Sequence, residues 1–268
     1  MFRRQLLTVR PKCCDCGDQN FMSKTHVEVI VRLDKLLSSL GYGSRKSISG
    51  MAKKGFIVLD NSRIHDSSHK VNITSDVRDR LYIKGEKLDP MPGMVLMMNK
   101  PLGATCSHKE LGKLVYDFLP DRWRHRTPAL STIGRLDKET SGLLLITDDG
   151  PLLHKVISPK NHVKKVYLVD VADPLTKDAV DIFASGALTL RGDIKPLAGA
   201  ELKMIDPKRA LITITEGRYH QVRRMFAAIG NRVVRLHRTQ IGGLKLPDTL
   251  DESSWKNLSP RDISLIFD

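Results

Sequence analysis

One segment of this sequence, residues 134–147, restricts the possible folds more than any other. It begins with a loop bounded by two glycines, in which the carboxylate Asp137 stands between the cations Arg135 and Lys138. The apolar run 143–146 follows at once, and a short apolar run of this kind predicts a buried strand. Two interpretations are open. The loop is either an acid held at a sheet edge against a polyanion, as in an active site, or a solvated charged turn before a core strand.

The composition favours a polyanionic partner. The 268 residues include 44 Lys and Arg against 30 Asp and Glu, a formal net charge of +14 at pH 7. Such an excess of cations is typical of proteins that bind nucleic acid, although a basic surface without a partner would give the same count. The length suffices for one large domain or two smaller ones. No apolar run approaches the roughly 20 residues of a membrane span, so no membrane partner is expected.

The N-terminal segment is basic and contains most of the cysteines. The first twelve residues carry four cations and no acid, which is compatible with an organelle-targeting sequence or with a basic tail that touches RNA. We expect a cytoplasmic protein, with a mitochondrion or plastid as the alternative if this segment is a targeting sequence. Cys13, Cys14 and Cys16 follow. Cys13 and Cys16 have a metal-like spacing, but no second ligand pair lies at zinc-finger spacing, so free thiols are expected rather than a structural zinc.

The hydrophobic pattern divides the chain into four parts: a flexible extension over residues 1–29, a small α/β unit over 30–89, a linker over 90–95 and a larger domain over 96–268. In the small unit, leucines at helical spacing end at Gly41, and Ser44 can cap a second helix. The larger domain mixes strands and helices irregularly, which predicts an α+β fold with a central, mainly antiparallel sheet. The predicted strands include 56–59, 81–83, 94–98, 166–171 and 210–215, and a helix is predicted over 179–185.

Four segments of the larger domain carry side chains suited to chemistry. They are residues 99–107, the Asp137 loop, residues 165–167 and residues 216–226. In the last segment, apolar residues at helical spacing predict a helix that buries Val222, Met225 and Phe226. Phosphate-loop, zinc-protease and nucleophile-elbow motifs are missing. Taken singly, each segment is also compatible with an ordinary strand or helix.

Together and in this order, the four segments resemble those of RNA pseudouridine synthases, and the likeness extends over residues 31–266. Within that family the chain is most similar to the small-subunit ribosomal RNA type, RsuA. The resemblance implies that Asp137 is the catalytic aspartate, that Tyr167 stacks on the target base and that Arg223 pairs with the aspartate. One departure from the family pattern is Gln240, which stands where a second arginine is usual.

Residues 30–89 resemble the alpha-L RNA-binding module, two helices with a basic exposed face followed by a short hairpin, and the matching residues lie between Arg32 and Gly55. A generic helical hairpin with a solvated face is the alternative. The turn at Asp60 and Asn61 replaces the usual Asn-Gly-like turn, and Asn tolerates the positive φ that such a turn needs. Across both parts of the chain, the side chains expected to contact RNA are Arg32, Lys35, Arg45, Lys46, Lys53, Lys54, Lys100, Arg135, Lys165, Arg218, His220, Gln221, Arg224 and Arg238.

The resemblance implies isomerisation of one uridine of small-subunit ribosomal RNA, free or in an assembling ribonucleoprotein, by a monomer that needs no metal or other cofactor. The chemistry suits the residues, because a carboxylate can attack or deprotonate the sugar while uracil leaves as a delocalised anion. Two alternatives remain. One is a non-catalytic ribosome-assembly protein that binds RNA, and the other is an RNA N-glycosidase that hydrolyses the bond instead of rejoining it.

Overall fold

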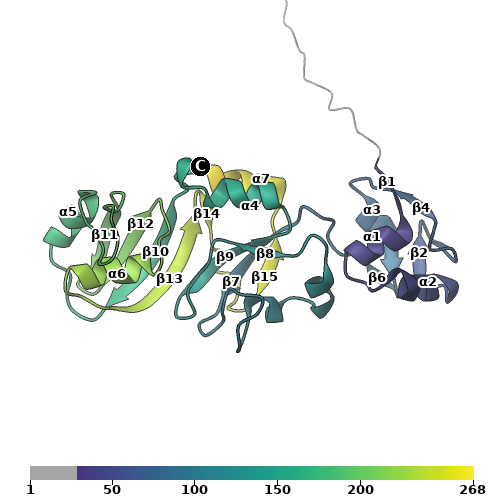
Figure 1. The fold of residues 1–268 in the computed structure, drawn as a ribbon, viewed down its shortest axis with the longest axis horizontal. Coiled ribbons are helices and arrows are strands. Elements are labelled where there is room, and N and C mark those ends of the chain that lie inside the picture. Colours follow the sequence, from purple (N-terminus) through teal and green to yellow (C-terminus); the bar gives the residue numbers. More distant parts are fainter. Residues whose placement is uncertain (1–28) are drawn as a thin grey trace, which may run out of the picture.

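The computed structural model describes residues 29–268 and has an elongated shape, with the small N-terminal unit at one end (Figure 1). The predictions about the basic N-terminal segment and about Cys13, Cys14 and Cys16 lie outside the described residues. Within them, no helix is long and apolar enough to span a membrane.

The small unit contains two helices followed by a short antiparallel sheet, as its pattern predicts, and also a short third helix and a separate two-stranded sheet, which the pattern does not predict. Its elements are β1 (Ile30–Arg32), α1 (Leu33–Ser39), α2 (Arg45–Lys53), β2 (Ile57–Leu59), β3 (Ser62–Arg63), β4 (Lys70–Asn72), α3 (Val77–Arg80), β5 (Leu81–Ile83) and β6 (Glu86–Lys87). The Ser44 hydroxyl accepts a hydrogen bond from the Ser47 amide and so caps α2. Asp60 and Asn61 both adopt positive φ, which gives the tight turn between β2 and β3.

The rest of the chain is built around one nine-stranded sheet. The strand order is β11-β12-β10-β13-β9-β7-β15, with β14 paired to β13 and β8 to β9. Only the β13–β9 pair is parallel, so the predicted α+β fold with a mainly antiparallel sheet is confirmed. The strands are β7 (Val95–Lys100), β8 (Ser131–Ile133), β9 (Ser141–Thr147), β10 (Lys165–Val171), β11 (Glu201–Asp206), β12 (Arg209–Ile214), β13 (Val233–Ile241), β14 (Leu244–Lys245) and β15 (Trp255–Asn257).

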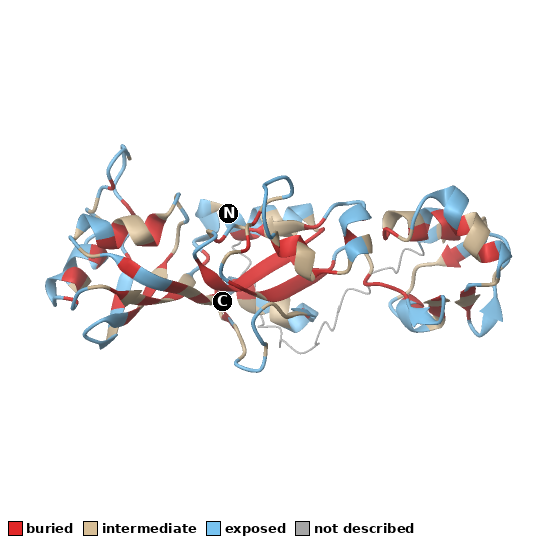
Figure 2. Cartoon of the chain, turned by 90° about the horizontal axis from the view of Figure 1, so that it is seen from below, coloured by how far each residue is buried: buried red, intermediate tan, exposed pale blue. Residues whose placement is uncertain are grey.

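Both faces of this sheet are covered, which explains why every residue of β9 is buried. On one face, Leu144 and Ile146 join a core with α5 (Asp178–Ala184), α6 (Gln221–Ala228) and the 3-10 turns η1 (Val115–Phe118) and η2 (Asp121–His125). On the other face, Leu143 and Leu145 pack with α4 (Gly150–Ile157) and α7 (Pro260–Ser264). Buried residues run along the central strands in Figure 2.

The small unit has its own core, formed mainly by leucines of α1 and by residues of α2, β2 and β5. Polar contacts join it to the larger domain. Arg122 donates two hydrogen bonds to the buried Asp89 carboxylate, at 2.7 and 2.8 Å, and the amide of Asp89 donates to the Tyr42 hydroxyl. Arg126 is also buried and donates to the Pro90 carbonyl and to Asp148. These contacts fix how the two parts lie relative to each other.

Candidate active site

The Asp137 loop is anchored on both sides of the carboxylate. Before it, Leu136 is buried in the core on the α6 side of the sheet. After it, the Thr140 amide donates to the Asp137 carbonyl at 3.0 Å, which closes a tight turn. The Asp137 side chain keeps 34% of its surface exposed and therefore projects from a fixed backbone into solvent-accessible space.

Lys100, at the end of β7, fixes the backbone of this loop through hydrogen bonds from its buried ammonium. Its ammonium donates to the carbonyls of Pro101, Asp137 and Thr140, at 3.0, 3.2 and 2.7 Å, and the side chain has no exposed surface. Burial lowers the pKa of Lys100 from its ordinary value. Contrary to the expectation from sequence, Lys100 cannot contact RNA, because its charge faces the carbonyls beneath the loop.

Gly142 allows the loop to join the sheet at this place. Its φ is +102°, and a Cβ here would lie 2.3 Å from the Arg238 carbonyl oxygen. The close approach is the point where β9 and β13 pair in parallel. Any side chain at residue 142 would separate these strands and displace the loop that carries Asp137.

Asp137 faces two connected hollows. The smaller has a volume of about 80 Å³ and is lined by Asp137, Tyr167, Arg223 and neighbouring residues. The larger is a groove of about 750 Å³ that includes Asp137, Arg135, His108 and Tyr116 in its walls. Tyr167 is only 8% exposed, so most of its ring is buried and the rest is at the smaller hollow. The structure thus brings Asp137, Tyr167 and Arg223 together.

The ionisable side chain that lies within 4 Å of the Asp137 carboxylate differs from the one expected. The Nε2 atom of His220 lies 3.5 Å from Oδ1 of Asp137, and the His220 ring stacks on Tyr219 with 3.9 Å between the ring centroids. Arg223 instead donates to the Glu139 carbonyl at 2.6 Å. The expected Arg223–Asp137 pair is therefore not formed in this structure. Arg223 holds the far end of the same loop through its backbone.

Arg238 is the second cation whose predicted RNA contact the structure contradicts. It is 3% exposed, and its Nε donates to the Leu143 carbonyl at 2.8 Å. Its Nη1 lies 3.5 Å from the Tyr167 hydroxyl, and its guanidinium carbon is 5.9 Å from the centre of the Tyr167 ring. Arg238 therefore positions Tyr167 from inside the sheet instead of binding phosphate.

Three residues near the start of α6 are also used within the protein. Arg218 and Arg224 both donate to Asp193, at 2.9 and 2.6 Å. The bond from Arg224, and after it the bond from Arg218, lowers the pKa of Asp193. Arg218 further donates to Glu216 and to two backbone carbonyls, so its donors are engaged. Gln221 is buried and bonds Arg218 and Glu216. Because Gln221 is buried, its predicted RNA contact is not possible in this structure. Arg218 and Arg224 each keep 27% of the side chain exposed, so their contact with RNA stays a prediction.

The other predicted RNA-binding side chains remain accessible. Arg135 is 71% exposed beside Asp137, and Lys165 is half-buried on β10. In the small unit, the six cations predicted to bind RNA are all exposed: Lys35, Arg45, Lys46, Lys53, Lys54 and Arg32, the last paired with Asp34 at 2.8 Å. Whether these residues bind RNA stays a prediction.

Sequence reasoning missed His108 and Tyr116, which line the groove from a segment without a recognisable motif. The Tyr219–His220 ring pair lies within a predicted segment, but nothing in the spacing shows that His220 reaches Asp137. In residues 29–268, no group of three or more His, Cys, Asp or Glu side chains is arranged to hold a metal ion.

Comparison with known proteins gives a consistent result. Residues 94–228 match the model of the RNA pseudouridylate synthase family. The ribosomal small subunit pseudouridine synthase A of Pasteurella multocida is 38% identical over 236 residues, which are 87% of this chain and 98% of that protein. The protein of the same name from Escherichia coli K12 is 36% identical over 241 residues, covering 88% of this chain and all of that protein. A crystal structure of a pseudouridylate synthase, 35% identical, aligns with a TM-score of 0.62 over 88% of this chain and 99% of that one.

Proposed function

This chain belongs to the RNA pseudouridylate synthase family, and we propose that it converts one uridine of small-subunit ribosomal RNA to pseudouridine with Asp137 as the catalytic carboxylate. The relatives named for the small ribosomal subunit support the substrate. The observation that carries the assignment of the catalyst is the anchored, partly exposed carboxylate that lines one hollow together with Tyr167 and also lines the larger groove.

The geometry suits the steps of this isomerisation. The bond between C1′ and N1 breaks, uracil leaves as a delocalised anion and turns, a bond forms between C1′ and C5, and the proton on C5 is lost as N1 gains one. Asp137 is open enough to attack or deprotonate the sugar, because a third of its side chain is exposed while its backbone is held by Lys100. The ring of Tyr167 can receive the extruded base.

Extruding the target uridine from its stack costs a few kcal/mol, and contacts made elsewhere along the RNA offset that cost. Arg135 lies beside Asp137 and can neutralise a phosphate near the target. The exposed cations of α2 would hold a more distant part of the same RNA. We propose that the substrate is ribosomal RNA bound by both parts of the chain, free or in an assembling particle.

Mapping of pseudouridine in small-subunit ribosomal RNA, with and without this protein, tests the proposal. One site should be modified only when the protein is present. Nucleoside analysis of treated RNA then separates three activities: pseudouridine indicates the synthase, free uracil an N-glycosidase, and neither product a non-catalytic RNA-binding protein. Either of the last two results would refute the proposed function.

A further inference from the structure

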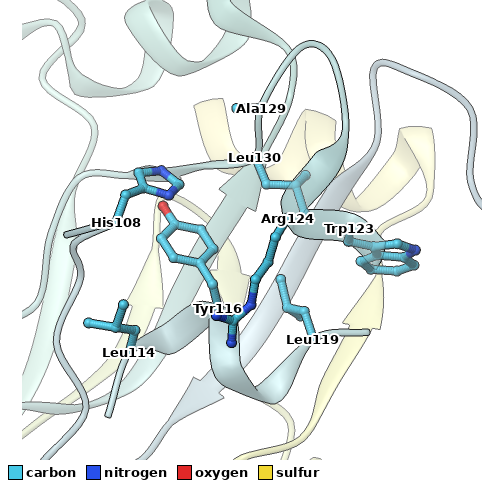
Figure 3. A pocket seen from close by; sticks show the side chains of 8 residues that line it. All are labelled: His108, Leu114, Tyr116, Leu119, Trp123, Arg124, Ala129 and Leu130. Carbon is cyan, nitrogen blue, oxygen red and sulfur yellow. The ribbon is translucent and has the colours of Figure 1, made fainter. Parts of the chain in front are cut away.

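A further cavity, separate from the two hollows at Asp137, lies next to the Asp137 groove and is not needed for the chemistry described above. Its volume is about 190 Å³. Figure 3 shows the rings of His108 and Tyr116 on one side and Leu119, Leu130 and Trp123 on the other, with the Arg124 side chain between them. A single water needs only about 10–15 Å³, so this cavity has room for a flat ring system.

The cavity and the groove share a wall. His108 and Tyr116 line both, and their rings are stacked, with centroids 4.1 Å apart and planes 12° apart. An RNA strand that lay in the groove with its target base at Asp137 would therefore bring a nucleotide near the target to this ring pair, beside the cavity.

The walls suit a nucleobase. Tyr116 and Trp123 are almost fully buried, at 6% and 3% exposure, and leucines supply the remaining apolar surface. Burial raises the pKa of Tyr116 to about 12, so its hydroxyl stays protonated at neutral pH. Arg124 pairs with Asp117 but keeps 46% of its side chain exposed, and it places a cation where the sugar and phosphate of an inserted nucleotide would lie.

We propose that this cavity receives a second nucleobase of the RNA, from a nucleotide near the target uridine that leaves the stack together with it. The inference rests on the proposed function, because it assumes that RNA occupies the groove at Asp137. Apolar and aromatic walls accept the face of any base, and stacking on them offsets the cost of unstacking a second nucleotide. The cavity would thereby favour target sites in which two nearby nucleotides can be extruded at once.

Ala129→Trp is the variant that tests this. Ala129 lines the cavity and is exposed, so a large side chain there fills the cavity from its rim without replacing a core residue. Ala184→Trp is the matched control, because Ala184 is an exposed alanine at the end of α5. That helix packs on β11 at one edge of the sheet, whereas the cavity residue Leu130 directly precedes β8, which pairs with β9. The substrates are an RNA fragment with the mapped target and a series in which one flanking nucleotide at a time is abasic.

The wild-type protein should lose about tenfold or more in kcat/KM at one abasic position, since stacking of a base on an aromatic wall is worth that much. Ala129→Trp should show the same loss on intact RNA and no further loss on that abasic RNA, while Ala184→Trp should behave as the wild type. Two results would overturn the inference. One is wild-type kinetics for Ala129→Trp on intact RNA. The other is a further loss when Ala129→Trp acts on the abasic RNA, so that the effects of the substitution and of the missing base multiply.

A binding measurement separates this inference from the proposed function. 2-Aminopurine at the same flanking position should become more fluorescent when the wild-type protein binds, because the base leaves its stack, and should change much less with Ala129→Trp. This readout does not need turnover. Unchanged fluorescence with the wild-type protein refutes the second base site, whereas absence of pseudouridine from RNA with the normal base refutes the synthase activity.

Discussion

At the scale of single residues, the arrangement around Asp137 gives its carboxylate one clear task. Asp137→Asn keeps the shape of the side chain and removes its charge, while the hydrogen bonds to the loop backbone remain. We expect turnover to fall by at least about a hundredfold, since a positioned catalytic group typically contributes 10²–10⁴-fold. Binding of RNA should persist. Turnover and a binding constant for the same RNA check this, and near-normal turnover would show that another residue is the catalyst.

Lys100 should act through the position of Asp137 and not through contact with substrate. Lys100→Met keeps most of the buried stem and removes the ammonium, so three buried carbonyls lose their donor. Each buried carbonyl that loses its donor costs about 1–3 kcal/mol, so the free energy of unfolding and the melting temperature should both fall. Turnover should fall with a nearly constant KM, because the groove itself is kept. Thermal unfolding and steady-state kinetics measure both, and a variant with normal stability and activity would contradict this role.

Tyr167→Phe separates a stacking role from a proton-transfer role. Phe keeps the ring and loses the hydroxyl, which lies 3.5 Å from Nη1 of Arg238. We expect RNA binding to be kept and turnover to fall by about 10²–10⁴-fold, as for the loss of a general acid or base. Full activity would reduce the tyrosine to a platform for the base. Weak binding would instead indicate a structural role, since Arg238 would then lose a buried partner.

The same residues show what can and cannot be predicted from a sequence. The place of Asp137 at the start of a core strand is predictable, because the apolar run after it marks that strand. Lys100, Arg238 and Gln221 are buried, and their predicted contacts with RNA are wrong. A cation is buried only where the fold supplies partners for it, and for Lys100 these are the carbonyls of Pro101, Asp137 and Thr140. That the distant residues 137 and 140 lie beside Lys100 is a property of the folded sheet and not of the local sequence.

At the scale of elements, hydrophobic spacing and turn chemistry predict the two main helices of the small unit and the strands β2 and β5, but not its shorter elements. α1, the Ser44 cap of α2 and the turn at Asp60 and Asn61 follow from local rules. The strand β13 is not predicted, because arginine, histidine and other polar residues interrupt its apolar alternation. Its polar side chains find partners across the sheet, such as Ser141 for His237 at 2.8 Å.

The exposed face of α2 leads to a prediction about salt dependence. Neutralising Arg45, Lys46, Lys53 and Lys54 together should weaken RNA binding and flatten its dependence on log salt, by roughly one unit of slope for each phosphate that the protein no longer neutralises. Neutralising the exposed Lys177 and Lys203, beside α5 and on β11, should leave the slope unchanged and serves as the control. If the slope is the same for all three proteins, the basic face of α2 does not touch RNA.

At the scale of the whole molecule, the sequence indicates two parts but not how they are joined. From the sequence, Arg122 is an ordinary surface cation and Asp89 a residue before a linker. In the structure Asp89 is 5% exposed, accepts two hydrogen bonds from Arg122 and, through its amide, contacts Tyr42. The Arg122 guanidinium lies 5.3 Å from the centre of the Tyr42 ring. This contact sets the direction in which the basic face of α2 points relative to the groove.

Asp89→Asn should therefore separate binding of long RNA from chemistry. It removes the charge that orients Arg122 while each part keeps its own core. When two binding surfaces are held in a fixed orientation, effective concentration raises their joint affinity for one RNA by about 10²–10⁴-fold. Loosening the contact between the small unit and the larger domain should therefore raise KM for long ribosomal RNA by about tenfold. A short RNA that fits only the Asp137 groove should be modified as fast as by the wild-type protein.

Kinetics on the long and the short RNA check this prediction, and small-angle scattering detects a looser contact between the two parts. Equal losses on both would mean that the substitution damages the catalytic domain, and no loss on long RNA would mean that the two parts bind it independently.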